Sequence, residues 1–502
     1  MSEAGEVVET FQFRLTLRNN WPPLAWVAKA RKGDGEIEVI HGPRVETSAA
    51  WVCEAAWAGS FSQGDFDETD LVSGTGIRLR DGKAVFVSSG STVDRIVSCE
   101  TGNDFYVSNS LIGLAASLDL TVDPLYDKFY DDFRTIVNGV ENYKAFVETS
   151  KPPVRLTYFR NLIFNGDRLT ICDKPCGDRR FASFSEYHDF LKESLVRIGQ
   201  NMADRARKYS YTPLGTLSTG YDSPTVAVLS KNMGNSEVLT FQHGRGGTND
   251  DGSEIASRLN LKPIALDRGM WRQQQGSEIP FIAANAYGEE SHYVAAKPLL
   301  AGRLLLTGYH GDKVWDTSTH DLSPVIKRGD PSGLALTEWR LWIGFLHCPL
   351  PFFGVRNIDE IYRISMSDEM KPWRVGGDYD RPICRRIVEA EGVPRELFGN
   401  QKSAASVVLW DHTEGFLPAH SMKQYTEWLR RYRSRWLRRR QLPPTWGLQL
   451  HSVKSSLARM AGKHREPGAP VSDYLFRHLF PWAFEAAKQR YTGAGREPNA
   501  SA

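Results

Sequence analysis

Two short polar loops in this sequence have the residue types that bind phosphate and a divalent cation. The first loop, residues 217–223, follows an expected apolar strand (213–217) and precedes an expected helix (225–231). Amide groups at the start of a helix carry partial positive charge, so they stabilise a phosphate without a cationic side chain. The candidate nucleotide-binding residues of this loop are Leu217, Ser218, Thr219, Gly220, Tyr221, Asp222 and Ser223.

Several residues of the first loop have a defined place in such a site. Ser223 suits the N-cap position, because its hydroxyl can accept a hydrogen bond from an unpaired amide of the first turn, and Pro224 suits the first helical position. Gly220 lets the backbone approach a ligand closely. Asp222 is a carboxylate where a phosphate-bound Mg²⁺ needs an oxygen ligand. The loop is therefore expected to hold a di- or triphosphate and its magnesium ion.

The second loop follows the apolar run 303–307 and contains Gly308, Tyr309 and Asp312. In a parallel α/β sheet, ligands bind at the carboxyl ends of the strands. Asp312 is therefore expected to reach the same Mg²⁺ and pyrophosphate as Asp222, since two carboxylates make a better octahedral site than one. Gly308 is included among the nucleotide-binding residues.

A glycine-rich loop, 243–251, lies between these two in the sequence and follows another expected strand. Asp250, Asp251 or Glu254 could face an adenosine. Plain capping of the helix expected over 254–261 explains these acids equally well. The sequence leaves both interpretations open.

Both polar loops resemble motifs of one enzyme family. The pattern Ser-x-Gly-x-Asp-Ser is similar to the PP-loop, Ser-Gly-Gly-x-Asp-Ser, of the ATP pyrophosphatases, which include asparagine synthetases, β-lactam synthetases, GMP synthetase and tRNA-modifying ligases; Thr219 departs from the usual glycine. The second loop resembles the Ser-Gly-x-Gly-Ala-Asp-Glu motif of asparagine-synthetase-type enzymes, with Lys313 where these usually have glutamate. Tyr309 matches β-lactam and carbapenam synthetases. The resemblance covers about residues 210–405.

The resemblance implies catalytic roles for Tyr309, Glu338 and Lys402. In β-lactam synthetases a tyrosine and a downstream glutamate deprotonate an amine of the substrate, and Glu338 is the candidate for that glutamate. Lys402, at the end of the matching block 379–402, corresponds to the lysine that meets the α-phosphate and the charge developing at the acyl carbon. A solvated glutamate on a helix rich in Trp and Leu, and a surface lysine, are the alternatives.

The activity implied by the resemblance is that of an ATP-dependent, amide-forming ligase with ATP and Mg²⁺ as cofactors. A carboxylate of a small molecule or peptide would be adenylated with release of pyrophosphate, and an amine of the same or a second molecule would then displace AMP. Two alternatives stay open. One is a PP-loop enzyme that modifies a nucleobase or tRNA, supported only by the arginine-rich segment 428–440. The other is a catalytically inactive relative that binds ATP or a partner.

The elements that must position these loops fall into two regions. Residues 1–180 have short alternating or apolar runs, which predict antiparallel sheets. Over 181–490, strands alternate with helices, which predicts an α/β domain with a doubly wound, mostly parallel sheet; 491–502 is expected to be a disordered tail. The strands expected in the first region are 10–17, 25–30, 36–40, 76–79, 84–88, 95–98, 105–108 and 156–163.

The resemblance also bears on the first region. Asparagine synthetases have an α+β, Ntn-type glutaminase there, with a catalytic cysteine at the second residue. This chain has Ser2, and its first cysteine is Cys53. We therefore expect a degenerate Ntn-like domain without glutaminase activity.

Composition narrows the classes of function. The 502 residues are 41% hydrophobic and 24% charged, which predicts a globular protein, and the net charge of +2 does not demand nucleic acid. No apolar run approaches the roughly 20 residues that cross a membrane, so we expect a cytoplasmic protein without a membrane partner. The six cysteines show no zinc-site spacing and are expected to be free thiols. Nucleic acid is not an expected partner, and a homodimer is one candidate assembly.

Overall fold

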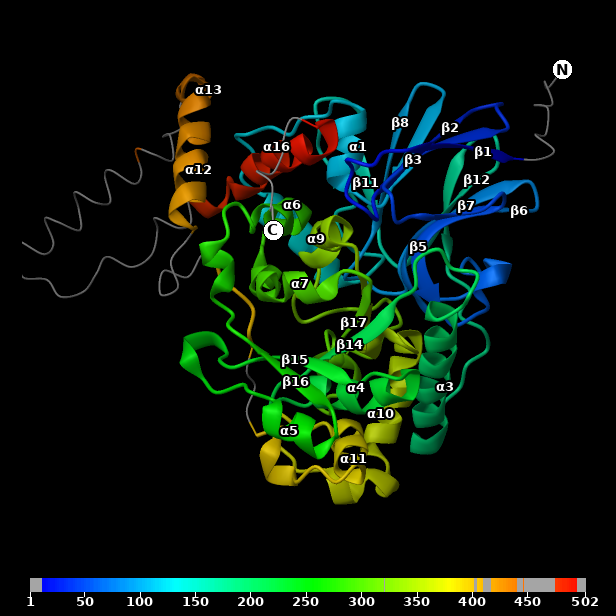
Figure 1. Cartoon of the computed structure of the whole chain (residues 1–502), viewed down its shortest axis with the longest axis vertical. Helices are drawn as coiled ribbons and strands as arrows, with labels where there is room; N and C mark the ends of the chain where they lie inside the picture. The colour runs from blue at the N-terminus through cyan, green and yellow to red at the C-terminus, as the bar shows by residue number, and fades with distance from the viewer. Residues whose placement is uncertain are drawn as a thin grey trace, which may run out of the picture.

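Three β-sheets organise the chain in this computed structural model (Figure 1). The structure describes residues 11–319, 321–400, 404–409, 417–439, 446 and 475–493. Two sheets are formed by the N-terminal region, and the third lies in the C-terminal region.

The two N-terminal sheets are antiparallel apart from one parallel edge pair, β1 with β3. The seven-stranded sheet has the order β1-β3-β2-β9-β8-β11-β10 and the six-stranded sheet the order β13-β12-β7-β6-β5-β4. Antiparallel sheets were expected here, and this is confirmed. The strands are β1 Gln12–Leu17, β2 Trp26–Arg31, β3 Glu36–His41, β4 Glu46–Thr47, β5 Trp51–Trp57, β6 Val72–Arg80, β7 Lys83–Val87, β8 Ile96–Thr101, β9 Asp104–Ser108, β10 Phe146–Val147, β11 Val154–Thr157, β12 Arg160–Phe164 and β13 Leu169–Asp173.

Alternation of side chains explains the packing of these two sheets. In β3 every second residue is buried, and Val39 of this strand lies in a core with Ile77 and Phe86 of the other sheet. Apolar residues on facing sheets form one layer in this way. The single strand expected over 156–163 is wrong, because the chain turns at Phe159 (φ 57°) and passes from one sheet to the other.

The C-terminal sheet consists of five parallel strands in the order β16-β15-β14-β17-β18. Strands β15 and β16 are added on one side of β14, and β17 and β18 are then added on its other side. The strand order therefore reverses between β14 and β17. The doubly wound parallel arrangement that we predicted has this topology. Its strands are β14 Thr212–Thr216, β15 Glu237–Phe241, β16 Lys262–Leu266, β17 Arg303–Thr307 and β18 Leu346–Pro349.

Helices cover both faces of this sheet (Figure 1). Helix α4 packs against β14 and β17, α5 packs against β16, and α7 packs against β17. Each βα crossover places a helix on a face, which leaves the loops at the strand ends free to form a site. The helices of this region include α3 Phe184–Met202, α4 Asp222–Ser230, α5 Ser253–Arg258, α6 Ile279–Asn285, α7 Lys297–Leu300, α8 Gly311–Val314, α9 Leu336–Ile343, α10 Ile358–Met366 and α11 Pro382–Ala390.

The two regions share one continuous hydrophobic core. Helix α3 packs on β5, and the last described helix, α16 (Leu479–Thr492), packs between α1 (Leu111–Ser117) and α6. We expected residues 491 and 492 to belong to a disordered tail. This prediction is wrong, because the two residues end α16 and the Tyr491 side chain is buried. Residues 494–502 lie outside the described part of the chain.

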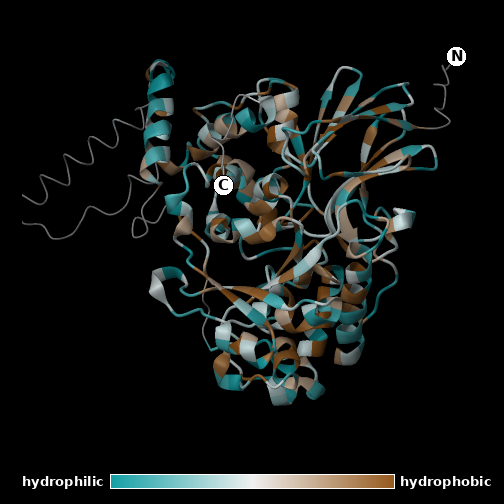
Figure 2. Cartoon of the chain, in the orientation of Figure 1, coloured by the Kyte–Doolittle hydropathy of each residue, from teal (hydrophilic) through white to brown (hydrophobic). Residues whose placement is uncertain are grey.

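The arginine-rich segment forms α12 (Ala419–Arg431) and α13 (Arg433–Arg438), which Figure 2 shows as mostly hydrophilic. Trp428 and Trp436 are buried, whereas the arginines are exposed. The segment is therefore a packed helix pair with a solvated basic surface. Within the described residues, no helix is long and apolar enough to cross a membrane.

Candidate functional site

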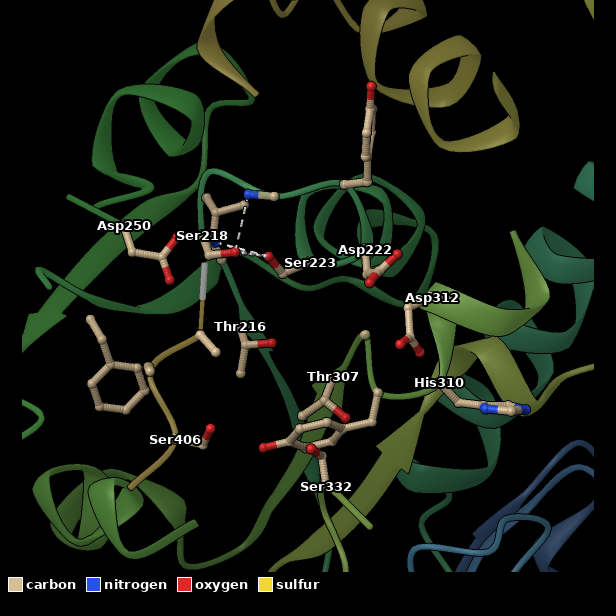
Figure 3. Close-up of a pocket in the computed structure, with 18 of the residues that line it drawn as sticks. Thr216, Ser218, Asp222, Ser223, Asp250, Thr307, His310, Asp312, Ser332 and Ser406 are labelled. Carbon is tan, nitrogen blue, oxygen red and sulfur yellow. Dashed lines mark hydrogen bonds between the residues drawn. The ribbon is translucent and has the colours of Figure 1, made fainter. Parts of the chain in front are cut away.

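A cavity of about 230 Å³ opens where the loops after β14 and β17 meet (Figure 3). These strands are parallel neighbours, so their carboxyl ends reach the same edge of the sheet. Both Asp222 and Asp312 line the cavity, and Figure 3 shows them directed into the same space. The structure thus brings together two carboxylates that are far apart in the sequence.

The first loop is held by its two serines. The amide of Ser218 donates to Oγ of Ser223 (2.9 Å), and the two hydroxyl oxygens are 2.7 Å apart. Helix α4 already begins at Asp222, so the prediction that Ser223 is its N-cap is wrong. The Ser223 hydroxyl instead closes the loop onto Ser218. Leu217, Gly220 and Tyr221 also line the cavity, as expected.

Thr219 is the expected nucleotide-binding residue of this loop that does not line the cavity. Its amide and its hydroxyl donate to Oδ1 of Asp250, at 3.2 and 3.1 Å. Asp250 itself lines the cavity. Thr219 therefore links the first loop to the glycine-rich loop after β15.

The other two acids near that glycine-rich loop, Asp251 and Glu254, do not line the cavity. Oδ1 of Asp251 accepts hydrogen bonds from the amide (2.9 Å) and the hydroxyl (2.5 Å) of Ser253, at the start of α5. Glu254 is exposed. Of the three acids, Asp250 is the one that lines the cavity, with the apolar side chains of Leu239 and Phe241.

Arg381 is a cavity residue to which sequence reasoning assigned no role. Its guanidinium bonds to Asp222 through Nη1, and its Nε donates to Oδ2 of Asp316 (3.1 Å). Burial raises the pKa of Asp222, while Arg381 opposes this shift and the nearby Asp312 adds to it. Asp312 is therefore near enough to Asp222 for electrostatic repulsion, which a divalent cation between them would relieve. The only sequence signal was the position of Arg381 before Pro382, at the start of α11.

Glycines let the two loops touch. A Cβ on Gly308 would lie 2.5 Å from Cβ of Asp222, and one on Gly311 would lie 2.5 Å from the Asp222 carboxylate. Such distances are far shorter than a van der Waals contact. Gly308 therefore acts by allowing Asp222 to approach the second loop, and it also lines the cavity.

His310, between these glycines, has a left-handed backbone (φ 77°) and stacks on Phe352, with ring centroids 4.8 Å apart. Its ring points away from the two aspartates in Figure 3. Burial lowers the pKa of His310 to about 3. His310 is therefore neutral, and its stacked ring anchors the second loop.

Tyr309 lines the cavity, as the resemblance implied, but Glu338 does not. The Glu338 carboxylate accepts hydrogen bonds from Ser110 Oγ (2.7 Å), Trp342 Nε1 (2.9 Å) and the Tyr491 hydroxyl (2.7 Å). Burial still raises the pKa of Glu338, although all three donors favour the ionised form. The structure thus places Glu338 in a closed network and does not bring it to Tyr309.

Lys402 lies outside the described residues. The residues that follow it do line the cavity, from Ala404 to Ser406. Two arginines hold this stretch: the Arg245 amide donates to the Ala404 carbonyl (2.8 Å), and Arg268 Nη2 donates to the Ser406 carbonyl (2.8 Å). Loops after β15 and β16 therefore fix one wall of the cavity.

The carboxylates of Asp222 and Asp312 suit magnesium better than a metal ion whose ligands all come from the protein. In the described part of the chain, no group of three or more His, Cys, Asp or Glu residues could hold a metal ion. Mg²⁺ commonly takes one or two carboxylates and completes its shell with water and phosphate oxygens. Asp222 and Asp312 would supply two carboxylates to such an ion.

No family model matches this chain, and no curated protein matches it. The resemblance to PP-loop enzymes therefore stays a prediction from motifs.

Proposed function

We propose that this protein is an ATP-dependent ligase that adenylates a substrate carboxylate and forms an amide, as asparagine-synthetase-like PP-loop enzymes do. The observation that carries the proposal is the meeting of Asp222 and Asp312 at the point where the strand order of a parallel sheet reverses. Ligands bind at this place in open α/β sheets. The cavity there combines the start of α4, the hydroxyls of Ser218 and Ser223, the carboxylates of Asp222 and Asp312, and the buried Arg381.

These groups suit the first half-reaction. A carboxylate oxygen of the substrate attacks the α-phosphorus of ATP, and pyrophosphate leaves. The amides at the start of α4 and the hydroxyls of Ser218 and Ser223 would bind phosphate oxygens. Magnesium held by Asp222 and Asp312 would neutralise the charge on the pyrophosphate. Arg381, already in the cavity wall, would stabilise the charge that develops during the transfer.

In the second half-reaction an amine attacks the acyl carbon, and AMP leaves with the electrons of the broken C–O bond. Tyr309 lies in the cavity wall and can accept the proton that nitrogen loses. Lys402 remains the candidate for the cation that meets the α-phosphate. The amine belongs to the acyl substrate or to a second molecule.

Glutamine-derived ammonia is not part of the proposal. Cys53, the first cysteine, is fully buried in β5, and burial raises the pKa of its thiol far above the ordinary value. A buried, protonated thiol is a poor nucleophile. Ser2, at the place of the glutaminase cysteine, lies outside the described residues.

The test is pyrophosphate release from Mg·ATP with a panel of small carboxylates and short peptides, with and without added amines. We expect release with part of the panel and its loss in Asp222→Asn. Asp359→Asn, at an exposed ion pair on α10, is the matched control and should keep the wild-type rate. ATP binding without pyrophosphate release from any carboxylate would favour the inactive relative, and release that requires RNA would favour nucleobase modification.

A further inference from the structure

Arg381 binds two carboxylates through different atoms of its guanidinium. Its Nε donates to Oδ2 of Asp316 (3.1 Å), and its Nη1 donates to Oδ1 of Asp222. The side chains of Arg381 and Asp316 are 3% and 5% exposed, whereas that of Asp222 is 23% exposed. The pair with Asp316 is therefore closed to solvent, and the pair with Asp222 opens into the cavity.

Asp316 is itself fixed by its own loop. Its Oδ1 accepts hydrogen bonds from the amide (2.8 Å) and the hydroxyl (2.6 Å) of Ser318, which leaves Oδ2 for Arg381. The Tyr379 ring packs beside the guanidinium, with Arg381 Cζ 5.1 Å from the ring centroid. Arg381 is thus anchored at Nε, and it would stay in the cavity wall if Nη1 released Asp222.

The Asp222 oxygen that Arg381 binds also faces the second loop. A Cβ on Gly311 would lie 2.5 Å from Oδ1 of Asp222, and the next residue is Asp312. A cation shared by Asp222 and Asp312 would therefore approach Asp222 beside the guanidinium. Two cations at one carboxylate repel each other. Arg381 and a divalent cation thus compete for Asp222.

We propose that Arg381 makes binding of the divalent cation conditional on the nucleotide. This inference rests on the proposed function, which supplies Mg·ATP as the ligand. When no phosphate is bound, Arg381 neutralises Asp222 and weakens the affinity of this carboxylate for a cation. Phosphate oxygens at the start of α4 offer Nη1 another anionic acceptor, and hydrogen bonds between charged groups are the strong ones. Arg381 can then leave Asp222 without losing an ionic partner.

No second arginine or lysine is available for this exchange among the described residues that line the cavity. The coupling is reciprocal: a nucleotide that raises the affinity for the cation is itself bound more tightly when the cation is present. The two ligands are therefore expected to enter together, and a cation alone should bind weakly.

The first test uses a metal ion alone. Mn²⁺ takes the same carboxylate and water ligands as Mg²⁺, and electron paramagnetic resonance measures its free concentration. Without nucleotide, Arg381→Gln should bind Mn²⁺ about 10-fold more tightly than the wild type, because the competing cation is gone. The gain should vanish in the double variant Arg381→Gln/Asp222→Asn. Arg363→Gln, at an exposed ion pair with Asp359, is the control and should bind Mn²⁺ as the wild type does.

Equal Mn²⁺ affinities of the wild type and Arg381→Gln would overturn the proposal, whether or not the protein is a ligase. Conversely, the expected Mn²⁺ pattern without pyrophosphate release from any carboxylate would contradict the ligase and leave the role of Arg381 standing.

Two further variants separate direct competition from general electrostatics and from misfolding. Arg381→Lys keeps the charge, but a lysine ammonium is a single point charge and lacks the two separate arms of the guanidinium. Its Mn²⁺ affinity should lie between those of the wild type and Arg381→Gln, and a wild-type affinity would contradict direct competition. Asp316→Asn retains the pair of Arg381 with Asp222, so it serves if Arg381→Gln does not fold. Nη1 should then leave Asp222 less easily, which should weaken Mg·ATP binding at least ~3-fold; unchanged or tighter binding would contradict the proposal.

Discussion

The N-terminal sandwich and the crevice of the parallel sheet bury charge in different ways. Where the sandwich meets α9, Arg340 bonds to Glu54 and Asp94, each at 2.6 Å, and the three side chains are at most 5% exposed. At the crevice, Arg381 bonds to Asp222, yet the Asp222 side chain is 23% exposed. The first cluster is closed to solvent, and the second opens into a cavity.

This difference separates charges that hold the fold from charges that are available for chemistry. Glu54 also accepts hydrogen bonds from Thr75 (2.6 Å) and Asn109 (3.1 Å), so its carboxylate has no room for a ligand. Asp222 keeps an open side beside Asp312. Removal of one partner of a buried ion pair strongly destabilises the folded protein, whereas groups directed at a ligand contribute little to its stability. Four predictions follow this contrast.

The largest effect is expected for Arg340→Ala. Removal of the guanidinium leaves two buried carboxylates, Glu54 and Asp94, without their cation, so the free energy of unfolding should fall by about 3–5 kcal/mol. Urea unfolding measures this change. Arg431→Ala, which removes an exposed pair with Glu485, is the control and should cost less than about 1 kcal/mol. Similar losses of unfolding free energy in the two variants would show that the buried cluster contributes no more to stability than an exposed ion pair.

The second prediction reverses the pattern at the crevice. Asp312→Asn should reduce pyrophosphate release by at least ~10²-fold, since it removes one of two carboxylates that would hold magnesium. Its unfolding curve should stay close to that of the wild type, because Asp312 lines the cavity. A variant that unfolds early but keeps its activity would contradict the assignment.

A smaller effect is expected for Glu338→Gln, which tests the catalytic role that the resemblance implied. The amide can still accept hydrogen bonds from Ser110 and Tyr491, so we expect a loss of about 1–2 kcal/mol in stability. The rates of pyrophosphate release and amide formation should stay near wild type in the folded protein. Loss of amide formation alone, at unchanged stability, would restore Glu338 as the partner of Tyr309.

Local pattern explains why much of the fold could be predicted from the sequence. Alternation over 36–40 indicates β3, and the apolar run of β17 (Arg303–Thr307) indicates a buried parallel strand. Strand β5 was missed because all seven of its residues are buried, so it shows no alternation. It lies in the sandwich and also contacts α3 of the other region.

The same limit on prediction from local sequence applies to the candidate site. Strand ends predict that Asp222 and Asp312 meet, because parallel neighbours end at one edge of the sheet. Partners that arrive from elsewhere in the chain leave no such signal: Ser110 is 228 residues from Glu338, and Arg381 is 159 residues from Asp222. The resemblance thus implied a catalytic role for Glu338, whereas its tertiary contacts place it in a closed network of hydrogen bonds.

The smallest effect concerns Glu289, whose buried carboxylate is charged at high pH. Its pKa is raised above the ordinary value of 4.5 by burial and by Glu290, so the folded state binds this proton more tightly than the unfolded state. Stability is therefore lost as the pH rises above 4.5, and the loss is complete once the folded carboxyl has ionised. Glu289→Gln removes that loss: it should stabilise the protein by about 1 kcal/mol at pH 8 and leave it unchanged at pH 4. Thermal unfolding at the two pH values measures the difference. A stabilisation equal at both pH values would mean that Glu289 has the same pKa in the folded and the unfolded protein, which would contradict the prediction.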